Sequence, residues 1–165
     1  MSYRERSDLP NAVREIENAF IPLADGCSLA ARIWLPNDAE KHPVPAILEY
    51  IPYRKRDFMR ARDEPMHHYL AGHGYAAVRV DLRGSGDSDG ILIDEYHSQE
   101  QADAVEVIAW LASQTWCNGN VGMTGISYLA AEYVKYLSQP GKLVCLLLIV
   151  AMLGFLGKYF DEIGW

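Results

Sequence analysis

Apolar residues fall into short, dense runs along the chain, and most runs are bounded by glycine, proline or aspartate. Short runs predict buried strands, while longer stretches with apolar residues three and four apart predict helices. The pattern predicts strands at 14–22, 29–35, 46–51, 75–82, 121–124 and 143–151. It predicts helices at 63–71, from Ser98 onward and at 128–137.

Turn-forming residues punctuate this pattern. Asp25-Gly26 separates the first two strands and suits a turn in which positive φ is tolerated. Pro36 ends the second strand, because proline cannot donate to a strand ladder. Gly72 or Gly74 can end the first helix in the left-handed conformation. These signals support the predicted boundaries.

The helix that starts at Ser98 carries its own start signal. Ser98 is predicted to cap the helix, and Gln101 to return the hydrogen bond. One face of the helix carries only apolar residues, namely Ala104, Val107, Ile108 and Leu111. The acidic residues Glu100, Asp103 and Glu106 fall elsewhere, so we expect an amphipathic helix with its apolar face on the core.

The order of elements indicates the fold class. Two opening strands are followed by alternating strands and helices, and the later strands are mostly apolar without alternation. This is typical of an α/β protein whose mostly parallel sheet is covered by helices on both faces. Chemistry in such sheets sits on loops beyond the carboxyl ends of the strands, so the loops after Ile51, Leu82 and Thr124 are the candidates.

Composition narrows the function classes. The chain has 165 residues, 50% of them apolar and 22% charged, which excludes a disordered protein and suits one globular domain. The formal net charge is −7. An acidic balance argues against a nucleic-acid or anionic-membrane partner.

The cysteines and the apolar segments favour a cytoplasmic protein. Cys27, Cys117 and Cys145 are odd in number and far apart, as expected for ordinary thiols in a reducing compartment. Residues 1–10 are rich in charge and do not read as a secretory signal. The apolar stretch 143–156 is shorter than the ~20 residues that cross a bilayer, so we interpret it as a buried strand with a following loop.

A serine stands where a nucleophile could stand. Gly125-Ile126-Ser127 lies between a predicted strand and a predicted helix. A serine on such a turn exposes its oxygen at the sheet edge, and the next backbone N–H, that of Tyr128, points at a developing oxyanion. A lone Gly-x-Ser is also a common helix cap, so these residues alone leave both interpretations open.

Three linked sequence blocks add specificity. They are Pro52-Tyr53-Arg54-Lys55, the stretch Val80-Asp81-Leu82-Arg83-Gly84-Ser85-Gly86-Asp87-Ser88-Asp89-Gly90, and the region 103–129 with Trp110, Trp116 and Gly125-Ile126-Ser127-Tyr128. With this order and spacing, the chain resembles the X-Pro dipeptidyl-peptidase and cocaine-esterase-like (CocE/NonD) family of α/β-hydrolases. The resemblance is good over about residues 20–129 and poor afterwards.

The resemblance implies a serine hydrolase that acts on ester or peptide bonds without a metal or an organic cofactor. By the same resemblance, Ser127 matches the nucleophile, and the Tyr128 backbone N–H and the Tyr53 hydroxyl match the two oxyanion donors. A loop tyrosine packed on the sheet edge is the alternative for Tyr53. Residues 1–165 are then expected to be the N-terminal portion of a catalytic domain, with 1–13 flexible and 158–165 approaching a cap domain.

Other motifs have structural interpretations. The glycines after 75–82 resemble a dinucleotide loop, but the third glycine comes one position late and no helix opens there. We expect a tight turn in which Arg83 and Asp87 pair. The basic residues Arg54, Lys55, Arg56, Arg60 and Arg62 are expected to form a solvated loop, with a substrate carboxylate or a nucleic acid as the weaker alternative.

Two departures from the family pattern stand out. Ala130 occupies the place where the family usually has glycine, so its methyl group would crowd the turn. All five histidines, His42, His67, His68, His73 and His97, precede Ser127, whereas the base of this fold normally follows the serine. We expect His67, His68 and His73 to be loop or helix-surface residues.

Two hypotheses from different classes follow. The first is a serine hydrolase, weak or inactive as this isolated chain because no histidine follows Ser127. The second is a catalytically incomplete chain that acts through chain–chain association, with the apolar strand 143–151 at an exposed sheet edge. A membrane-associated protein that uses 143–156 is a third, less favoured class.

Overall fold

The computed structural model describes residues 8–94, 97–126 and 148–150. The elements in chain order are β1 (Val13–Pro22), β2 (Ser28–Pro36), β3 (Val44–Tyr50), α1 (Arg60–Gly72), β4 (Ala76–Val80), α2 (Ser98–Ser113), β5 (Cys117–Ile126) and β6 (Leu148–Val150). The first five predicted strands are confirmed, with β5 longer than expected. Of the predicted strand 143–151, residues 148–150 form β6, and the others lie outside the described residues. The predicted helix at 128–137 lies outside the described residues.

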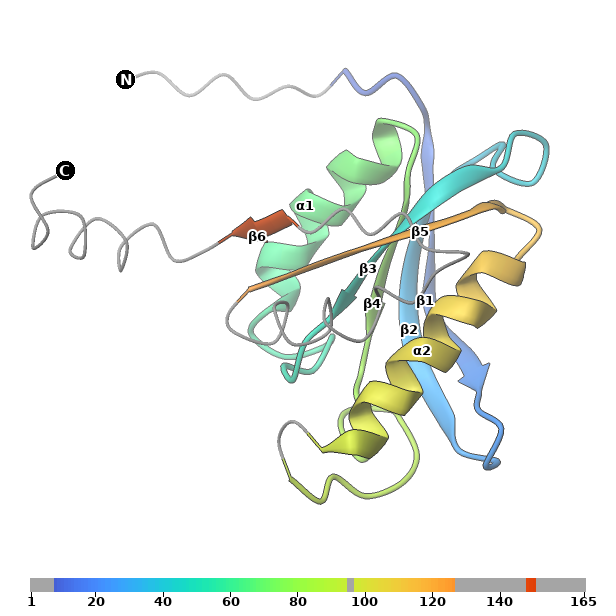
Figure 1. Cartoon of the computed structure of the whole chain (residues 1–165). Helices are drawn as coiled ribbons and strands as arrows, with labels where there is room; N and C mark the ends of the chain where they lie inside the picture. The colour runs from blue at the N-terminus through green and yellow to red at the C-terminus, as the bar shows by residue number, and fades with distance from the viewer. Residues whose placement is uncertain (1–7, 95–96, 127–147, 151–165) are drawn as a thin grey trace, which may run out of the picture.

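The six strands form one mixed sheet in the order β1-β2-β4-β3-β5-β6 (Figure 1). β1 and β2 pair antiparallel, and so do β2 and β4. β4, β3, β5 and β6 then pair in parallel. The structure confirms the predicted α/β class with a mostly parallel sheet.

One face of the sheet is apolar and is covered by α2. Alternate strand residues point to this face, among them Ile33, Leu48 and Val78, and they pack with Val107 and Leu111 of α2. These side chains are at most 1% exposed. Burying a large aliphatic side chain contributes about 1.5–3 kcal/mol, so this face holds the main hydrophobic core.

The opposite face is covered by α1 and is largely charged. Intervening strand residues point there because successive side chains alternate across a sheet. Trp34 and Ala77 pack with Ala71 of α1 in a small apolar cluster. Beside it lie three fully buried charged residues of the strands, Arg32, Glu49 and Arg79.

The start of α2 differs in detail from the prediction. Its cap is His97, whose Nδ1 accepts a hydrogen bond from the backbone N–H of Gln99 at 3.2 Å, and not Ser98 with Gln101. Asp103, expected away from the core, is fully buried. Two hydrogen bonds of 2.8 Å from Arg83 to its carboxylate offset the cost of burying this charge.

Two further expectations concern membranes and thiols. Over the described ranges, no helix is long and apolar enough to cross a bilayer. Cys27 and Cys117 are free thiols, and Cys145 lies outside the described residues. Burial is the largest influence on the Cys27 thiol and raises its pKa. A raised pKa does not suit a reactive cysteine, because the thiolate is the nucleophile.

Candidate active site

Two of the three candidate loops start side by side at one edge of the sheet. β3 and β4 run parallel with Tyr50 opposite Val80, so the segments that follow them, starting at Ile51 and Asp81, leave the sheet at the same edge. β5 runs parallel on the other side of β3, with Thr124 opposite Glu49. Ser127 follows β5 directly in sequence, but Ser127 and Tyr128 lie outside the described residues.

Tyr53 lies in the turn after β3. The residue is 37% exposed, so its side chain is accessible to a small molecule. Its ring stands edge to face against Phe58 of the same loop, with 6.0 Å between the ring centroids. Its backbone carbonyl points inward and accepts a hydrogen bond from Arg79 Nη2.

Arg79 anchors this turn from the protein interior. It belongs to β4, is fully buried, and donates from Nη1 to the carbonyls of Ile51 at 3.4 Å and Val80 at 3.2 Å. Its Nε donates to Asp63 of α1 at 3.1 Å. One guanidinium therefore joins the candidate oxyanion turn, the sheet and α1, a use that matches its rigid fork of donors.

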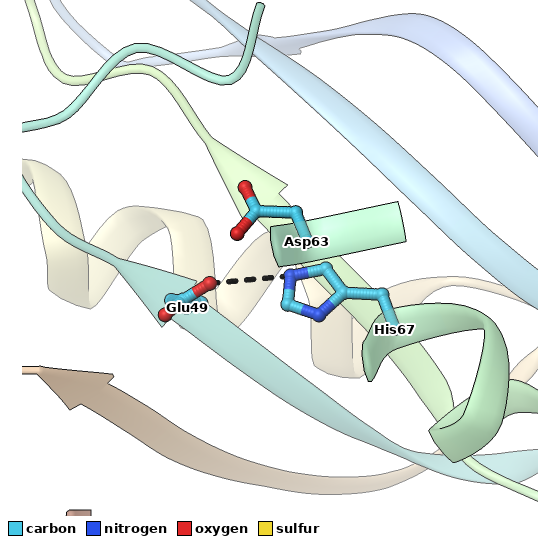
Figure 2. Close-up of side chains that lie close together, drawn as sticks. All are labelled: Glu49, Asp63 and His67. Carbon is cyan, nitrogen blue, oxygen red and sulfur yellow. Dashed lines mark ion pairs between the residues drawn. The ribbon is translucent and has the colours of Figure 1, made fainter. Parts of the chain in front are cut away.

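Glu49, Asp63 and His67 gather between β3 and α1 (Figure 2). Arg79 lies beside them, with its Nε 3.1 Å from Asp63 Oδ2 and 3.6 Å from Glu49 Oε2. Glu49, Asp63 and His67 are all at most 2% exposed, and one ligand atom of each lies within 4.8 Å of the others. His67 Nε2 lies 3.3 Å from Glu49 Oε2, and the ring stands edge-on to Trp34 at 4.7 Å. The expectation that His67 is a surface residue is wrong, because α1 presses this side chain onto the charged face of the sheet.

The donor set could suit a divalent cation, but two arginines already occupy the cation's role. Arg62 Nη2 lies 2.6 Å from both carboxylate oxygens of Glu49 and 2.6 Å from Asp63 Oδ1. Arg79 neutralises the second carboxylate. Two guanidiniums balance two carboxylates, so a divalent ion would add uncompensated positive charge to a buried site.

The protonation of Glu49 agrees with an ion-pair cluster. Burial acts to raise its pKa, but the contact with His67 and the charges of Arg79 and Arg62 outweigh it. They hold the pKa of Glu49 below its ordinary value of 4.5. Glu49 is therefore a buried carboxylate at neutral pH and a structural partner of the two arginines.

A second buried ion cluster holds the other end of the Tyr53 turn. Lys55 is 1% exposed, and its Nζ lies 2.9 Å from Asp81 Oδ2 and 2.7 Å from Asp87 Oδ2. The Lys55 backbone N–H also donates to Asp81 Oδ1 at 2.6 Å. The Asp81 carboxylate thus fixes the loop after β3 to the loop after β4.

The 84–90 segment is a self-bonded turn. Several of its backbone N–H groups are used within the protein: Gly84 donates to Asp89, Ser85 to Leu82, Ser88 to Ser85 and Asp87 to the Asp81 carboxylate. Groups that are already bonded cannot cradle a phosphate. The structural interpretation is therefore favoured over the dinucleotide alternative.

Two expectations for the charged residues are wrong. Arg83 does not pair with Asp87 but with Asp103 and Asp25, while Asp87 pairs with Lys55 and Arg56. The basic stretch is not simply a solvated loop, because Lys55 is buried and Arg60 and Arg62 reach carboxylates on β1 and β3. Arg54 and Arg56 remain partly exposed.

Sequence reasoning missed the groups that hold the turn, namely Glu49, Asp63, Arg79 and the carboxylate of Asp81. One signal was present in the sequence. Arg79 and Glu49 each stand alone as a charge in an otherwise apolar buried strand, and lone charges there require partners. The identity of those partners depends on tertiary contacts.

The strand order and the loops at the carboxyl edge define an α/β-hydrolase fold. The chain belongs to the X-Pro dipeptidyl-peptidase (S15) family, whose sequence model matches residues 25–164. The match extends past residue 129, where the motif-based resemblance becomes poor.

Individual relatives agree with this assignment. The chain is 39% identical over 113 residues to the cocaine esterase of Rhodococcus sp. strain MB1 Bresler, covering 68% of this chain and 19% of that protein. It is 35% identical over 80 residues to the Xaa-Pro dipeptidyl-peptidase of Lactobacillus helveticus strain DPC 4571, covering 39% and 10% of the two proteins.

Solved structures agree as well. A CocE/NonD family hydrolase from Staphylococcus aureus superimposes with a TM-score of 0.64 at 29% identity, covering 78% of this chain and 26% of that one. An α-amino acid ester hydrolase gives a TM-score of 0.58 at 26% identity, covering 87% and 26%. The chain thus spans about a fifth of the length of the cocaine esterase and a quarter of each of these structures.

Proposed function

We propose that the chain carries the nucleophile and the oxyanion donors of a serine hydrolase that acts on ester or amide bonds. Ser127 would attack the acyl carbon, and the Tyr53 hydroxyl and the Tyr128 N–H would donate to the oxyanion that forms. Water would then release the acyl group. A phenol suits this role because it is a neutral donor on a stiff side chain.

One observation carries the proposal. The parallel register of β3 and β5 brings the turn of Tyr53 and the end of the strand before Ser127 to neighbouring positions at one sheet edge. Nucleophile and oxyanion donors must converge on one reacting atom, which requires such neighbouring loops. Membership of the S15 family and similarity to named esterases and peptidases support the same chemistry.

No histidine of this sequence follows Ser127, where the base of this fold normally stands. The buried His67 is held against Glu49 and Trp34. We therefore expect the 165-residue chain to hydrolyse esters slowly by itself. Added imidazole could act as an external base, because general-base catalysis requires only a positioned or concentrated proton acceptor.

The test is hydrolysis of p-nitrophenyl acetate by the full chain, with and without imidazole, after subtraction of the rate in the same solution without protein. We expect an imidazole-dependent rate that Ser127→Ala abolishes and that Tyr53→Phe lowers about 10²-fold, the usual effect of removing one oxyanion donor. Equal rates for the wild-type chain and Ser127→Ala would overturn the proposal.

A second candidate function is chain–chain association. Ile91 and Ile93 are 78% and 76% exposed in the loop before α2, beside a hollow that Leu82 and His97 also line. Exposed apolar groups of this kind favour burial against another chain. Sedimentation of the wild-type chain and of Ile91→Asp/Ile93→Asp tests this: a dimer that the substitutions dissociate supports association, and a wild-type monomer excludes it.

A further inference from the structure

The turn that carries Tyr53 is held at both ends by fully buried cations. Arg79 binds the carbonyls of Ile51 and Tyr53, and Lys55 lies two residues after Tyr53 with its ammonium group on Asp81 and Asp87. Arg79 and Lys55 are at most 1% exposed, whereas Tyr53 is 37% exposed. The backbone of the turn is therefore anchored on the protein side, whereas the Tyr53 residue is partly exposed to solvent.

Such anchoring has a large electrostatic cost unless it is fully compensated. A buried charge must be paired and hydrogen-bonded, and here each cation meets carboxylates: Arg79 meets Asp63 and Glu49, and Lys55 meets Asp81 and Asp87. Simple packing of the turn would need none of these charges. Their convergence on backbone groups at 51, 53 and 55 points to a need for accurate placement.

We propose that Arg79 and Lys55 are positioning residues that hold the Tyr53 hydroxyl where an oxyanion would form. The inference rests on the proposed function and adds the groups that make its oxyanion site rigid. Oxyanion donors act only when they are preorganised, and a misplacement of about 1 Å can cost about 10²-fold in rate. Neither cation needs to touch the substrate.

The guanidinium shape predicts that Arg79 cannot be replaced by lysine without loss. Arginine offers five donors in a fixed plane, and Arg79 uses three different nitrogens toward the sheet, the turn and Asp63. Lysine keeps the positive charge that balances Glu49 and Asp63. Its single ammonium group cannot bind Asp63 and the carbonyls of Ile51 and Tyr53 at the same time. Arg79→Lys should therefore fold while it loosens the turn.

The experiment uses the full chain with 3-fluorotyrosine at position 53. The variants are Arg79→Met, Arg79→Lys and Lys55→Met. The matched control is Arg54→Met, since Arg54 is adjacent to Tyr53 but is exposed and pairs with Asp57 of its own turn. Fluorine NMR reports how well ordered the Tyr53 ring is. Hydrogen exchange of peptides from 51–56 reports loosening of the turn, and exchange of peptides from α2 shows whether the whole fold has loosened.

We expect one sharp fluorine signal for the wild-type chain and for Arg54→Met. Arg79→Met and Lys55→Met should broaden or split it and speed exchange in 51–56 by about tenfold or more, with exchange in α2 nearly unchanged. Arg79→Lys should broaden the fluorine signal and speed exchange in 51–56, but less than Arg79→Met does. In the imidazole-supported assay, kcat should fall about 10-fold or more with little change in KM.

Three results would overturn the proposal. The first is a sharp signal and unchanged exchange in folded Arg79→Lys and Lys55→Met. The second is an equal effect of Arg54→Met. The third is a disordered turn with an undiminished kcat. If Arg79→Met does not fold, Arg79→Lys and Lys55→Met decide alone. A wild-type chain without imidazole-supported turnover contradicts the proposed hydrolase, whereas the fluorine and exchange measurements still decide whether the cations order the turn.

Discussion

At the scale of single residues, Gly86 shows how closely the loops at the carboxyl edge are packed. Its φ is +58°, and a Cβ built on it would lie 2.1 Å from Asp81 Oδ2. Asp81 needs this space because its carboxylate also binds Lys55 and the Asp87 N–H. Glycine is thus required here both for backbone conformation and for the close approach of a buried carboxylate.

Gly86→Ala should therefore destabilise the protein more than an alanine substitution at a glycine where the only cost is backbone strain. Gly119 is the matched control, because its φ is +87° and no atom lies within 4 Å of the place that a methyl group would take. We expect Gly119→Ala to cost about 1–2 kcal/mol and Gly86→Ala to cost about 1–3 kcal/mol more, from overpacking. Urea unfolding measures both, and equal costs would contradict the close approach.

At the scale of elements, α1 packs on the sheet through charges more than through apolar groups. Its Asp63 and His67 lie against Glu49 of β3 and Arg79 of β4, whereas α2 covers its face with alanine, valine, isoleucine and leucine. A half-satisfied buried network is strongly destabilising, so the members of this cluster depend on one another. The sheet therefore has one face specified by packing and one specified by ion pairs.

Zinc binding tests whether the arginines take the place of a metal. We expect neither Zn²⁺ nor a chelator to change the melting temperature of the wild-type chain. Arg62→Met/Arg79→Met leaves Glu49, Asp63 and His67 without cationic partners, and zinc should then stabilise the protein, by about 2.7 kcal/mol at a concentration 100-fold above its Kd. Scanning calorimetry measures the shift, and stabilisation of the wild-type chain by zinc would contradict the ion-pair assignment.

The link between β1 and α1 predicts an unusual pH dependence. The hydrogen bond from Arg60, at 2.7 Å, holds the pKa of Glu17 at about 2, against an opposing effect of burial and an ordinary value of 4.5. Because the folded-state pKa is lowered, the charged Glu17 contributes stability above about pH 4.5, and this contribution is lost as the pH falls toward about 2.

A double-mutant cycle with Glu17→Gln and Arg60→Met tests this link. The coupling between the two side chains should persist at about pH 3.5, where an ordinary glutamate is mostly protonated. Urea unfolding of the four proteins at about pH 7 and pH 3.5 gives the coupling at each pH. A coupling that disappears by about pH 4 would show that the pKa of Glu17 is not lowered.

The contrast between the two faces explains what the sequence could predict. Strand positions and the α/β class follow from apolar runs and turn residues, since burial and turn geometry are local properties. The partners of Lys55, Arg83 and His67 do not follow, because a charge can pair with any carboxylate that the fold brings near. Arg83 illustrates this: Asp87 is close in sequence, but Asp103 on α2 is the partner in space.

At the scale of the whole molecule, the described residues make a sheet with two loops anchored at its carboxyl edge. The anchors converge on the turn of Tyr53, and the family relationship assigns the chain to the S15 hydrolases. The chemistry of the candidate site itself, including the roles of Ser127, Tyr53 and Tyr128, stays a prediction. The central claim is that Ser127 is the nucleophile and that the Tyr53 hydroxyl donates to the oxyanion formed by its attack.

Covalent trapping of Ser127 tests this claim most directly. The full chain is incubated with a p-nitrophenyl alkylphosphonate in the presence of imidazole, and peptide mass spectrometry locates the adduct. Phosphonylation develops negative charge on oxygen, as acyl transfer does, so it draws on the same donors. We predict one adduct, on Ser127, that forms about tenfold or more slowly in Tyr53→Phe. An unlabelled Ser127, or labelling no faster than that of other serines, would contradict the account.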